Sequence, residues 1–294
     1  YALFIGYRGN STADKGIYRN RIMIDLRETK FFVDAMHTRK SFDKSALLYD
    51  DVAALQREIG EKLFDRLDGI HIEPHTILDV GAGTGEPTVK LMKRYPHAAV
   101  VAMDIAPQML QVARKKAPLL RKMKCLCCDM HSLAIEDAAI DLIYSNVALQ
   151  WSGDLNKVFA EFNRILKPGG MLIFSTFGPR TLIELKEAWA KADDYTHVNS
   201  FAGFDAISSV LEKNGFGDIA ADEADVHLAY TDVCSLMKDL KTLGANNKTA
   251  GRPRGMTGKK RFKKMLQAYE ENRRYDTLPA TYEVIYVNAV KKDK

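Results

Sequence analysis

Short apolar runs alternate with amphipathic stretches through the middle of the chain. Five of these runs have the length of buried strands, and several end in an acidic or small polar residue. The predicted strands lie at 77–79, 98–103, 123–128, 140–145 and 171–177. The predicted helices lie at 86–94, 107–116 and 155–166, and a turn is expected at 167–170. This alternation indicates an α/β fold, an open and mostly parallel sheet with helices on both faces.

The flanking segments are predicted to complete and cover this sheet. Apolar residues recur at helical spacing from Ser41 to Leu67, which predicts a helix or helix pair before the first strand. Further helices are expected at 181–192, 203–214, 233–243 and 259–269, a sixth strand at 216–228 and an antiparallel seventh strand at 281–290. The expected parts are an extension without assigned role (1–36), a helical cover (37–72), the core (73–229 and 277–294) and a basic helical lid (230–276).

Charge is concentrated in the expected lid. The chain has 294 residues and a formal net charge of +5. Residues 238–274 contain twelve Lys or Arg and three acids, a local net charge of +9, so the other residues carry −4. A basic segment on a mildly acidic body indicates an anionic partner, and the alternative is a solvated lysine-rich surface.

Composition favours a globular, cytoplasmic protein. No apolar run approaches the ~20 residues of a membrane span, and nothing near residue 1 resembles a signal peptide. Three of the four cysteines, Cys125, Cys127 and Cys128, crowd into one predicted strand. That spacing suits neither a disulfide framework nor a zinc site, so we expect reduced core thiols and no metal.

A glycine-rich loop follows the first predicted strand. Gly81, Gly83 and Gly85 form a G-x-G-x-G run, whereas a dinucleotide loop would place its third glycine at position 86, which is Glu86. An acid at that helix start disfavours a pyrophosphate. The loop better suits a ligand without phosphate and with a positive end, which Asp79 could accept.

The run resembles the first motif of class I S-adenosylmethionine-dependent methyltransferases, which implies a seven-stranded Rossmann-like methyltransferase sheet. Asp104 ends the second strand, where an acid can accept both ribose hydroxyls. Ile105 and Met109 could pack on the adenine. Asp129, followed by Met130, could accept the adenine amino group. The alternatives are helix core for the apolar residues and a turn or helix cap for Asp129.

The fourth predicted strand leads into Ser145-Asn-Val-Ala148. Enzymes that methylate adenine N6 carry an Asn/Asp-Pro-Pro-aromatic motif there, so methylation of a nucleobase amino group is disfavoured. Asn146 and Gln150 are candidates to contact the methionine end of the cofactor or the substrate. Trp151 lines a substrate entrance or anchors a helix.

Several motifs resemble the malonyl-acyl-carrier-protein O-methyltransferases of biotin synthesis. They are Ser41–Asp50 with Leu55–Arg57, Ala148–Trp151, Ser175–Gly178, Lys241–Ala245 and Arg252–Gly255. The resemblance implies transfer of a methyl group from S-adenosyl-L-methionine to the free carboxylate of malonyl-acyl-carrier protein or malonyl-coenzyme A, giving S-adenosyl-L-homocysteine. A carboxylate with a pKa of about 4 is already ionised, so no general base is required.

The resemblance also implies roles for residues outside the glycine loop. Tyr49 would close over the cofactor and orient the substrate carboxylate, unless Phe42 and Tyr49 form only a buried stripe. The expected substrate contacts are Gln56, Arg57, Trp151 and Lys241, and the expected docking residues for the acidic carrier protein are Arg252, Arg254, Lys260 and Lys264. We assign no role to Arg180. Two alternatives remain, methylation of a small free carboxylic acid such as trans-aconitate and an RNA-binding or RNA-modifying protein.

Overall fold

A seven-stranded sheet forms the centre of the computed structural model, which describes residues 30–119, 121–243 and 258–293. Its strands are β1 (Thr76–Val80), β2 (Ala99–Asp104), β3 (Lys124–Cys127), β4 (Ile140–Asn146), β5 (Leu166–Phe177), β6 (Phe216–Tyr230) and β7 (Leu278–Lys291). The strand order is β3-β2-β1-β4-β5-β7-β6. The pairs among β1 to β5 are parallel, and β7 pairs antiparallel with β5 and β6. The predicted fold class, with an antiparallel seventh strand, is confirmed.

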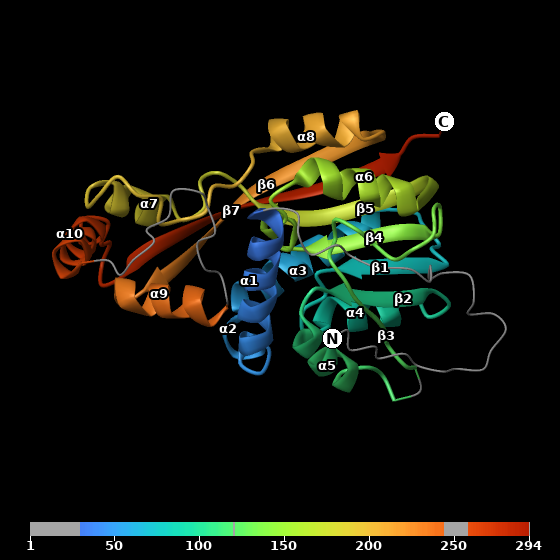
Figure 1. Cartoon of the computed structure of the whole chain (residues 1–294), viewed down its shortest axis with the longest axis horizontal. Helices are drawn as coiled ribbons and strands as arrows, with labels where there is room; N and C mark the ends of the chain where they lie inside the picture. Colours follow the sequence, from blue (N-terminus) through green and yellow to red (C-terminus); the bar gives the residue numbers. More distant parts are fainter. Residues whose placement is uncertain (1–29, 120, 244–257, 294) are drawn as a thin grey trace.

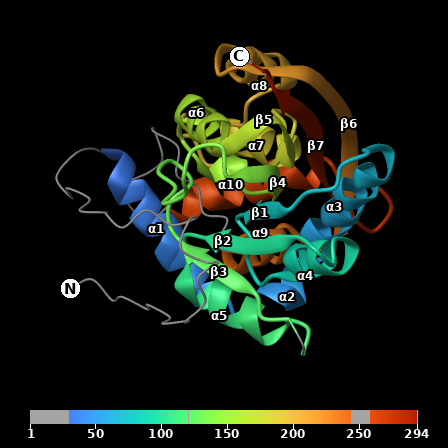
Figure 2. The same ribbon diagram turned by 90° about the vertical axis from the view of Figure 1, so that its right-hand side faces the viewer.

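Helices cover both faces of the sheet (Figures 1 and 2). The α-helices are α1 (Lys30–Ser45), α2 (Tyr49–Val52), α3 (Ala54–Asp65), α4 (Glu86–Arg94), α5 (Pro107–Lys115), α6 (Leu155–Ile165), α7 (Ile183–Ala190), α8 (Phe204–Lys213), α9 (Val233–Thr242) and α10 (Lys259–Glu270). Two short 3-10 helices are η1 (Arg66–Gly69) and η2 (Leu149–Trp151). None of the helices in the described part of the chain has both the length and the apolar character to cross a membrane.

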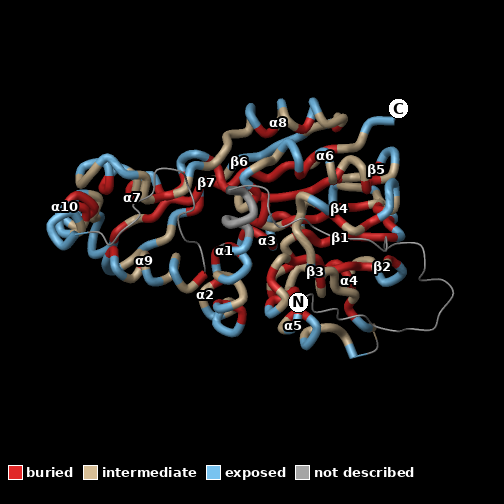
Figure 3. The backbone as a smooth tube through the Cα atoms, viewed as in Figure 1, coloured by how far each residue is buried: buried red, intermediate tan, exposed pale blue. Residues whose placement is uncertain are grey.

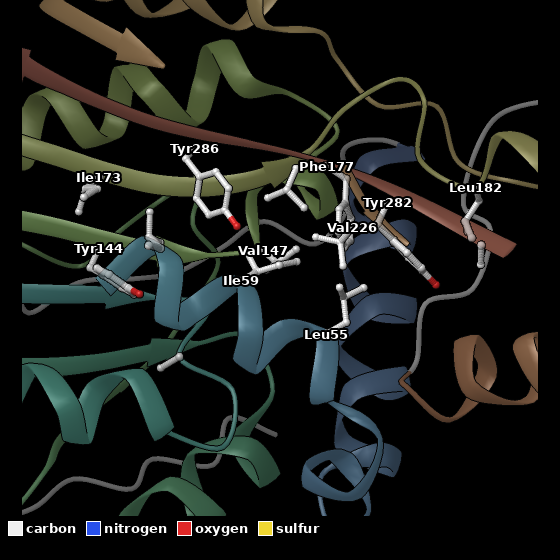
Figure 4. Packing of buried hydrophobic residues seen from close by; sticks show 14 of the residues in the cluster. Leu55, Ile59, Tyr144, Val147, Ile173, Phe177, Leu182, Val226, Tyr282 and Tyr286 are labelled. Atoms are coloured by element: carbon white, nitrogen blue, oxygen red, sulfur yellow. The ribbon is translucent and has the colours of Figure 1, made fainter. Parts of the chain in front are cut away.

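Strands β1, β2 and β4, and most of β5 and β7, are buried on both faces, as their continuous apolar runs predict. The edge strands β3 and β6 are more exposed. On β1, Ile77 packs in a cluster with α3, α4 and α5, and its neighbour Leu78 packs in a second cluster with α6 and α8. Burying one such side chain contributes about 1.5–3 kcal/mol. Figure 3 shows the buried strands between more exposed helices, and Figure 4 shows Leu55 and Ile59 of α3 among the core residues of the sheet. This double packing fixes the strand ends that carry the site.

Strands β6 and β7 extend beyond the other strands, and α7, α9 and α10 lie around their projecting end (Figure 1). Helices α9 and α10 come from the segment between these two strands, and α10 packs against α7. Helix α9 contacts both β6 and α2. Helix α9 of the expected lid therefore lies beside the N-terminal helix α2, whereas α10 lies beside α7.

Three boundaries differ from the prediction. Helix α1 begins at Lys30, so the expected boundary at residue 36 falls within a helix. The helix or helix pair expected at 41–67 is instead divided among α1, α2 and α3, with breaks at residues 46–48 and at Ala53. The turn at 167–170 is an irregularity within β5: Leu166 pairs with Ile140 and Met171 with Leu142, and Gly169 has a φ of +69°.

Candidate active site

The glycine loop between β1 and α4 has a left-handed backbone at each of its three glycines. The φ angles are +72° at Gly81, +54° at Gly83 and +83° at Gly85. A Cβ on Gly81 would lie 2.3 Å from the Cβ of Ala148, and one on Gly85 would lie 2.5 Å from the Cβ of Ala113. A Cβ on Gly83 would meet no atom within 4 Å. Gly81 and Gly85 therefore allow close packing, whereas Gly83 faces open space.

The acid that ends β2 is tied to this loop. Asp104 Oδ2 accepts a hydrogen bond of 2.9 Å from the backbone N–H of Gly83, and Oδ1 accepts one of 2.8 Å from Ala106. Burial raises the pKa of Asp104 to about 6, against the effect of these backbone hydrogen bonds. Each carboxylate oxygen retains a further acceptor position for a ligand.

Asp79 lies behind the loop. Its Oδ2 accepts a hydrogen bond of 2.5 Å from the hydroxyl of Thr88, and its side chain is buried. Burial raises the pKa of Asp79 to about 7. Asp79 does not line either of the two cavities that border the loop. The structure thus places Asp79 behind the loop, where it supports α4 through Thr88.

The first cavity lies at the carboxyl ends of β2 and β4. Its volume is about 720 Å³ with its open mouth included. It is lined by Thr38, Phe42, Tyr49, Gly81, Gly83, Met103, Asp104, Ile105, Met109, Asp129, Met130, His131, Asn146, Val147, Ala148 and Trp151. Eight of the residues predicted to bind the cofactor are therefore brought together: Gly81, Gly83, Asp104, Ile105, Met109, Asp129, Met130 and Asn146.

Asp129 is oriented by its neighbour His131. Its Oδ1 accepts a hydrogen bond of 2.9 Å from the backbone N–H of His131 and lies 2.5 Å from Nδ1 of that ring. Burial favours the protonated carboxyl, but the hydrogen bonds from His131 outweigh it and lower the pKa of Asp129. Asp129 is therefore an ionised acceptor at the wall of the first cavity.

The second cavity lies between the glycine loop and α3, with a volume of about 590 Å³ including its mouth. It is lined by Tyr49, Asp50, Ala53, Gln56, Arg57, Gly60, Gly81, Ala82, Gly83, Thr84, Glu86, Pro87, Lys90, Tyr144 and Asn146. Tyr49, Gly81, Gly83 and Asn146 also line the first cavity. A single elongated ligand can therefore occupy both cavities.

Polar groups on α3 face the second cavity. The Oε1 atom of Gln56 is buried and accepts no hydrogen bond from the described residues. Arg57 donates a hydrogen bond of 2.5 Å from Nη1 to the carbonyl of Asp50. Lys90, a second cation in this lining that was not predicted from the sequence, is ion-paired with Glu61 and lies 3.9 Å from Glu86 Oε1. The unused Gln56 acceptor and the Arg57 guanidinium in one lining suit a ligand end that carries both an ammonium and a carboxylate.

Helix α2 is fixed over the loop by Asp50, which was not predicted either. Its two carboxylate oxygens accept hydrogen bonds of 2.6 Å, one from the hydroxyl of Thr84 and one from Lys116 Nζ. The adjacent Tyr49 borders both cavities. Burial, with the carboxylates of Asp104 and Asp50 nearby, raises the pKa of Tyr49 well above its usual value. Tyr49 therefore stays a neutral phenol that can donate a hydrogen bond.

Residues at the end of β4 and directly after it differ in the cavity that they line. Asn146 Nδ2 donates a hydrogen bond of 2.9 Å to the Gln56 carbonyl, and Oδ1 accepts one of 2.7 Å from the Ser175 hydroxyl. Asn146 thus joins α3 to β5 at the cavity wall. Trp151 contacts Phe42 edge to face, with ring centroids 5.6 Å apart. Gln150 lines neither of these cavities but a third one, between η2, α6 and α8.

The remaining predicted residues lie farther out. Lys241, on α9, and Lys260 and Lys264, on α10, are exposed. Arg252 and Arg254 lie outside the described residues. Among the described residues, no group of three or more His, Cys, Asp or Glu side chains could hold a metal ion.

Known proteins resemble this chain over most of its length. Residues 78–174 match the family described as "Methyltransferase domain". A malonyl-[acyl-carrier protein] O-methyltransferase of Nitrosospira multiformis is 43% identical over 276 residues, which cover 88% of this chain and 90% of that protein. The protein of the same name from Halorhodospira halophila is 42% identical, with 87% and 88% covered. The biotin biosynthesis bifunctional protein BioHC of Cellvibrio japonicus is 38% identical, with 87% and 50% covered.

Solved structures share the fold. The YcgJ protein of Bacillus subtilis has a TM-score of 0.57 at 16% identity, covering 80% of this chain and 99% of that one. Phosphoethanolamine N-methyltransferase 2 of Haemonchus contortus, in complex with S-adenosyl-L-methionine, has a TM-score of 0.53 at 17% identity, covering 85% and 57%. At these identities the neighbours show that the fold of this chain is shared with known structures.

Proposed function

Because the chain belongs to the family of malonyl-[acyl-carrier protein] O-methyltransferases, we propose that it methylates the free carboxylate of malonyl-acyl-carrier protein. The observation that carries this proposal is the 43% identity to a relative of that name over 90% of its length. The BioHC relative supports a place in biotin synthesis. In the proposed reaction a carboxylate oxygen attacks the methyl carbon, the carbon–sulfur bond breaks, and the products are a methyl ester and S-adenosylhomocysteine.

The first cavity fits the adenosine part of the cofactor. Asp104 accepts the two ribose hydroxyls, because it lines the first cavity and its carboxylate is bonded to Gly83, whose Cβ position is open. Ile105 and Met109 pack against the adenine, and Asp129 accepts its amino group. Support for this placement comes from the lining of one cavity by all four residues.

The second cavity fits the amino-acid end of the cofactor. The unused Oε1 of Gln56 accepts a hydrogen bond from the ammonium group, and Arg57 and Lys90 lie near the carboxylate. The sequence motifs indicated Gln56 and Arg57 as substrate contacts. Their position favours the cofactor, because a malonyl carboxylate has no proton to donate to the Gln56 oxygen.

The acceptor carboxylate requires alignment rather than activation. S-adenosylmethionine supplies a methyl group made electrophilic by its sulfonium. Tyr49 borders both cavities and donates a hydrogen bond from its neutral hydroxyl, which orients the malonyl carboxylate. Alignment of two reactants can lower a barrier by several kcal/mol. Phe42 and Trp151 cover the cavity and exclude water from the nucleophile.

The basic lid steers the carrier protein to this site. Lys260 and Lys264 are exposed on α10, and Arg252 and Arg254 continue the same basic segment of the sequence. We assign all four to an acidic carrier-protein surface, and Lys241 to the polar part of the substrate near the lid. Such charges at the rim of an interface mainly raise the association rate and make it depend on salt.

The test is a methyl-transfer assay with labelled S-adenosylmethionine. Four acceptors are compared: malonyl-acyl-carrier protein, malonyl-coenzyme A, trans-aconitate and RNA. Labelled malonyl-carrier protein is the expected product, and mild alkaline hydrolysis should release the label as methanol from the ester. Transfer to trans-aconitate or RNA without transfer to a malonyl thioester would overturn the proposed function.

A further inference from the structure

The third cavity is the largest of the three, at about 920 Å³ with its mouth included. It lies at the carboxyl end of β5, between η2, α6 and α8. Its lining is Leu149, Gln150, Ser152, Gly153, Asp154, Leu155, Asn156, Phe159, Phe174, Thr176, Phe177, Ser200, Phe201, Ala202, Ile207 and Val210. The cofactor placement proposed above leaves this cavity without a ligand.

One short segment separates the third cavity from the first. Asn146, Val147, Ala148 and Trp151 line the first cavity, whereas Leu149, Gln150 and Ser152 line the third. Val147 has a φ of +48°, which is an uncommon conformation for a β-branched residue. Backbone strain of this kind concentrates at ligand sites. The two cavities therefore meet across the single turn formed by residues 147–151.

The walls combine an apolar base with a few polar groups. Phe159, Phe174 and Phe177 are buried, and Phe201 contacts Phe177 edge to face with ring centroids 5.7 Å apart. The polar groups include Gln150, whose Nε2 donates a hydrogen bond of 2.6 Å to the Val147 carbonyl and whose Oε1 accepts a long one of 3.4 Å from Thr176. Ser200 and Asn156 are exposed at the rim. This lining suits a flexible chain with apolar groups and amides.

The rim of the third cavity is connected to the basic lid. The loop from α7 to α8 begins beside α10, where Arg261 Nη1 lies 4.0 Å from Asp193 Oδ2. Trp189 of α7 packs against Phe262 of α10, with ring centroids 6.4 Å apart. The same loop then supplies residues 200–202 to the cavity. One loop therefore leads from the proposed docking helix to the third cavity.

We propose that the third cavity binds the 4′-phosphopantetheine arm of the carrier protein. This inference rests on the proposed function. The arm has two amides and a gem-dimethyl group, which match the amide, hydroxyl and phenyl groups of the lining. Its thioester end approaches Gln150, and the malonyl carboxylate extends past the turn toward Tyr49 and Trp151.

The test compares binding of holo-carrier protein, which carries the arm, with apo-carrier protein, which lacks it. Titration calorimetry is performed with S-adenosylhomocysteine present. The wild type should bind the holo form about tenfold more tightly, equivalent to about 1.4 kcal/mol. Ala202→Trp at the rim and Val210→Trp on α8 each place an indole in the cavity, and each should bring the ratio of the apo and holo dissociation constants close to one. Ala190→Trp, exposed on α7 outside the cavity, should keep the wild-type ratio.

The outcomes separate the arm from the docking surface. The proposal would be overturned if Ala202→Trp and Val210→Trp both still bind the holo form about tenfold more tightly than the apo form. Their affinity for S-adenosylhomocysteine should be unchanged in that comparison. Equal binding of the holo and apo forms by the wild type would overturn it too. Wild-type methylation of malonyl-carrier protein in the same preparation would then show that the proposed function still stands.

Discussion

The backbone N–H of Gly83 donates a hydrogen bond of 2.9 Å to the carboxylate of Asp104. This bond joins the glycine loop after β1 to the end of β2, across 21 positions of the sequence. Among the three loop glycines, Gly83 alone has open space at its Cβ position, and it is held by the acid proposed to bind ribose. Changes in the charge of Asp104 should therefore affect the loop and the ligand together.

The first prediction concerns the pH dependence of cofactor binding. The pKa of Asp104 is raised to about 6 by burial, so the carboxylate is charged above that pH and protonated below it. Because two ribose hydroxyls require the charged acceptor, affinity for S-adenosylhomocysteine should fall about tenfold between pH 7 and pH 5. Calorimetry across this range measures the change.

Two variants identify the titrating group. Asp104→Asn should bind S-adenosylhomocysteine weakly at every pH, and its affinity should not fall further below pH 6. Asp79 also has a raised pKa, about 7, but is bonded to Thr88 away from the cavities. The affinity of Asp79→Asn for S-adenosylhomocysteine should therefore still fall between pH 7 and pH 5. A pH dependence that is lost in the Asp79 variant and kept in the Asp104 variant would reverse the assignment.

The second prediction separates the glycines of the loop. Alanine at position 81 places a Cβ 2.3 Å from Ala148, so Gly81→Ala should lower the free energy of unfolding by about 3 kcal/mol. Gly83→Ala has room and should cost about 1–2 kcal/mol for its left-handed backbone. The added methyl at position 83 should nevertheless weaken S-adenosylhomocysteine binding. Urea unfolding and calorimetry measure the two effects, and equal destabilisation by both variants would contradict the steric argument.

The third prediction tests the second cavity. Gln56→Leu removes the unused acceptor and should weaken S-adenosylhomocysteine binding about tenfold, as expected for a hydrogen bond to a charged group. Methylthioadenosine lacks the amino-acid end, so its affinity should not change. A matched loss for both ligands, or a higher KM for malonyl-carrier protein alone, would argue against this placement of the cofactor.

The fold was predictable because its determinants are local. Buried strands require continuous apolar runs, and Asp104 and Asp129 follow such runs directly. Since parallel strands end at one edge of a sheet, the sequence alone sufficed to place both acids in one site. The start of α1 at Lys30 was missed because residues 30–36 show no clear apolar period.

The supporting contacts were not predictable because distant segments form them. Asp50 binds Thr84 and Lys116, which lie 34 and 66 positions away. Periodicity carries no information about such partners. Gln150 lies only four positions after Asn146, yet the turn of η2 directs it into the third cavity. A sequence pattern could not show that Asn146 and Gln150 face different cavities.

The last prediction concerns the basic lid. Carrier proteins are acidic, so reversing Lys260 and Lys264 together to Glu should weaken carrier-protein binding about tenfold at low ionic strength. The difference from wild type should shrink as salt rises from about 0.05 to about 0.5 M, because exposed charges are screened within a shorter distance. A variant with Lys93 and Lys115 reversed, both exposed on α4 and α5, changes the net charge equally. If that control loses as much affinity, overall charge steers the carrier protein; if only the α10 variant does, the lid is its docking surface.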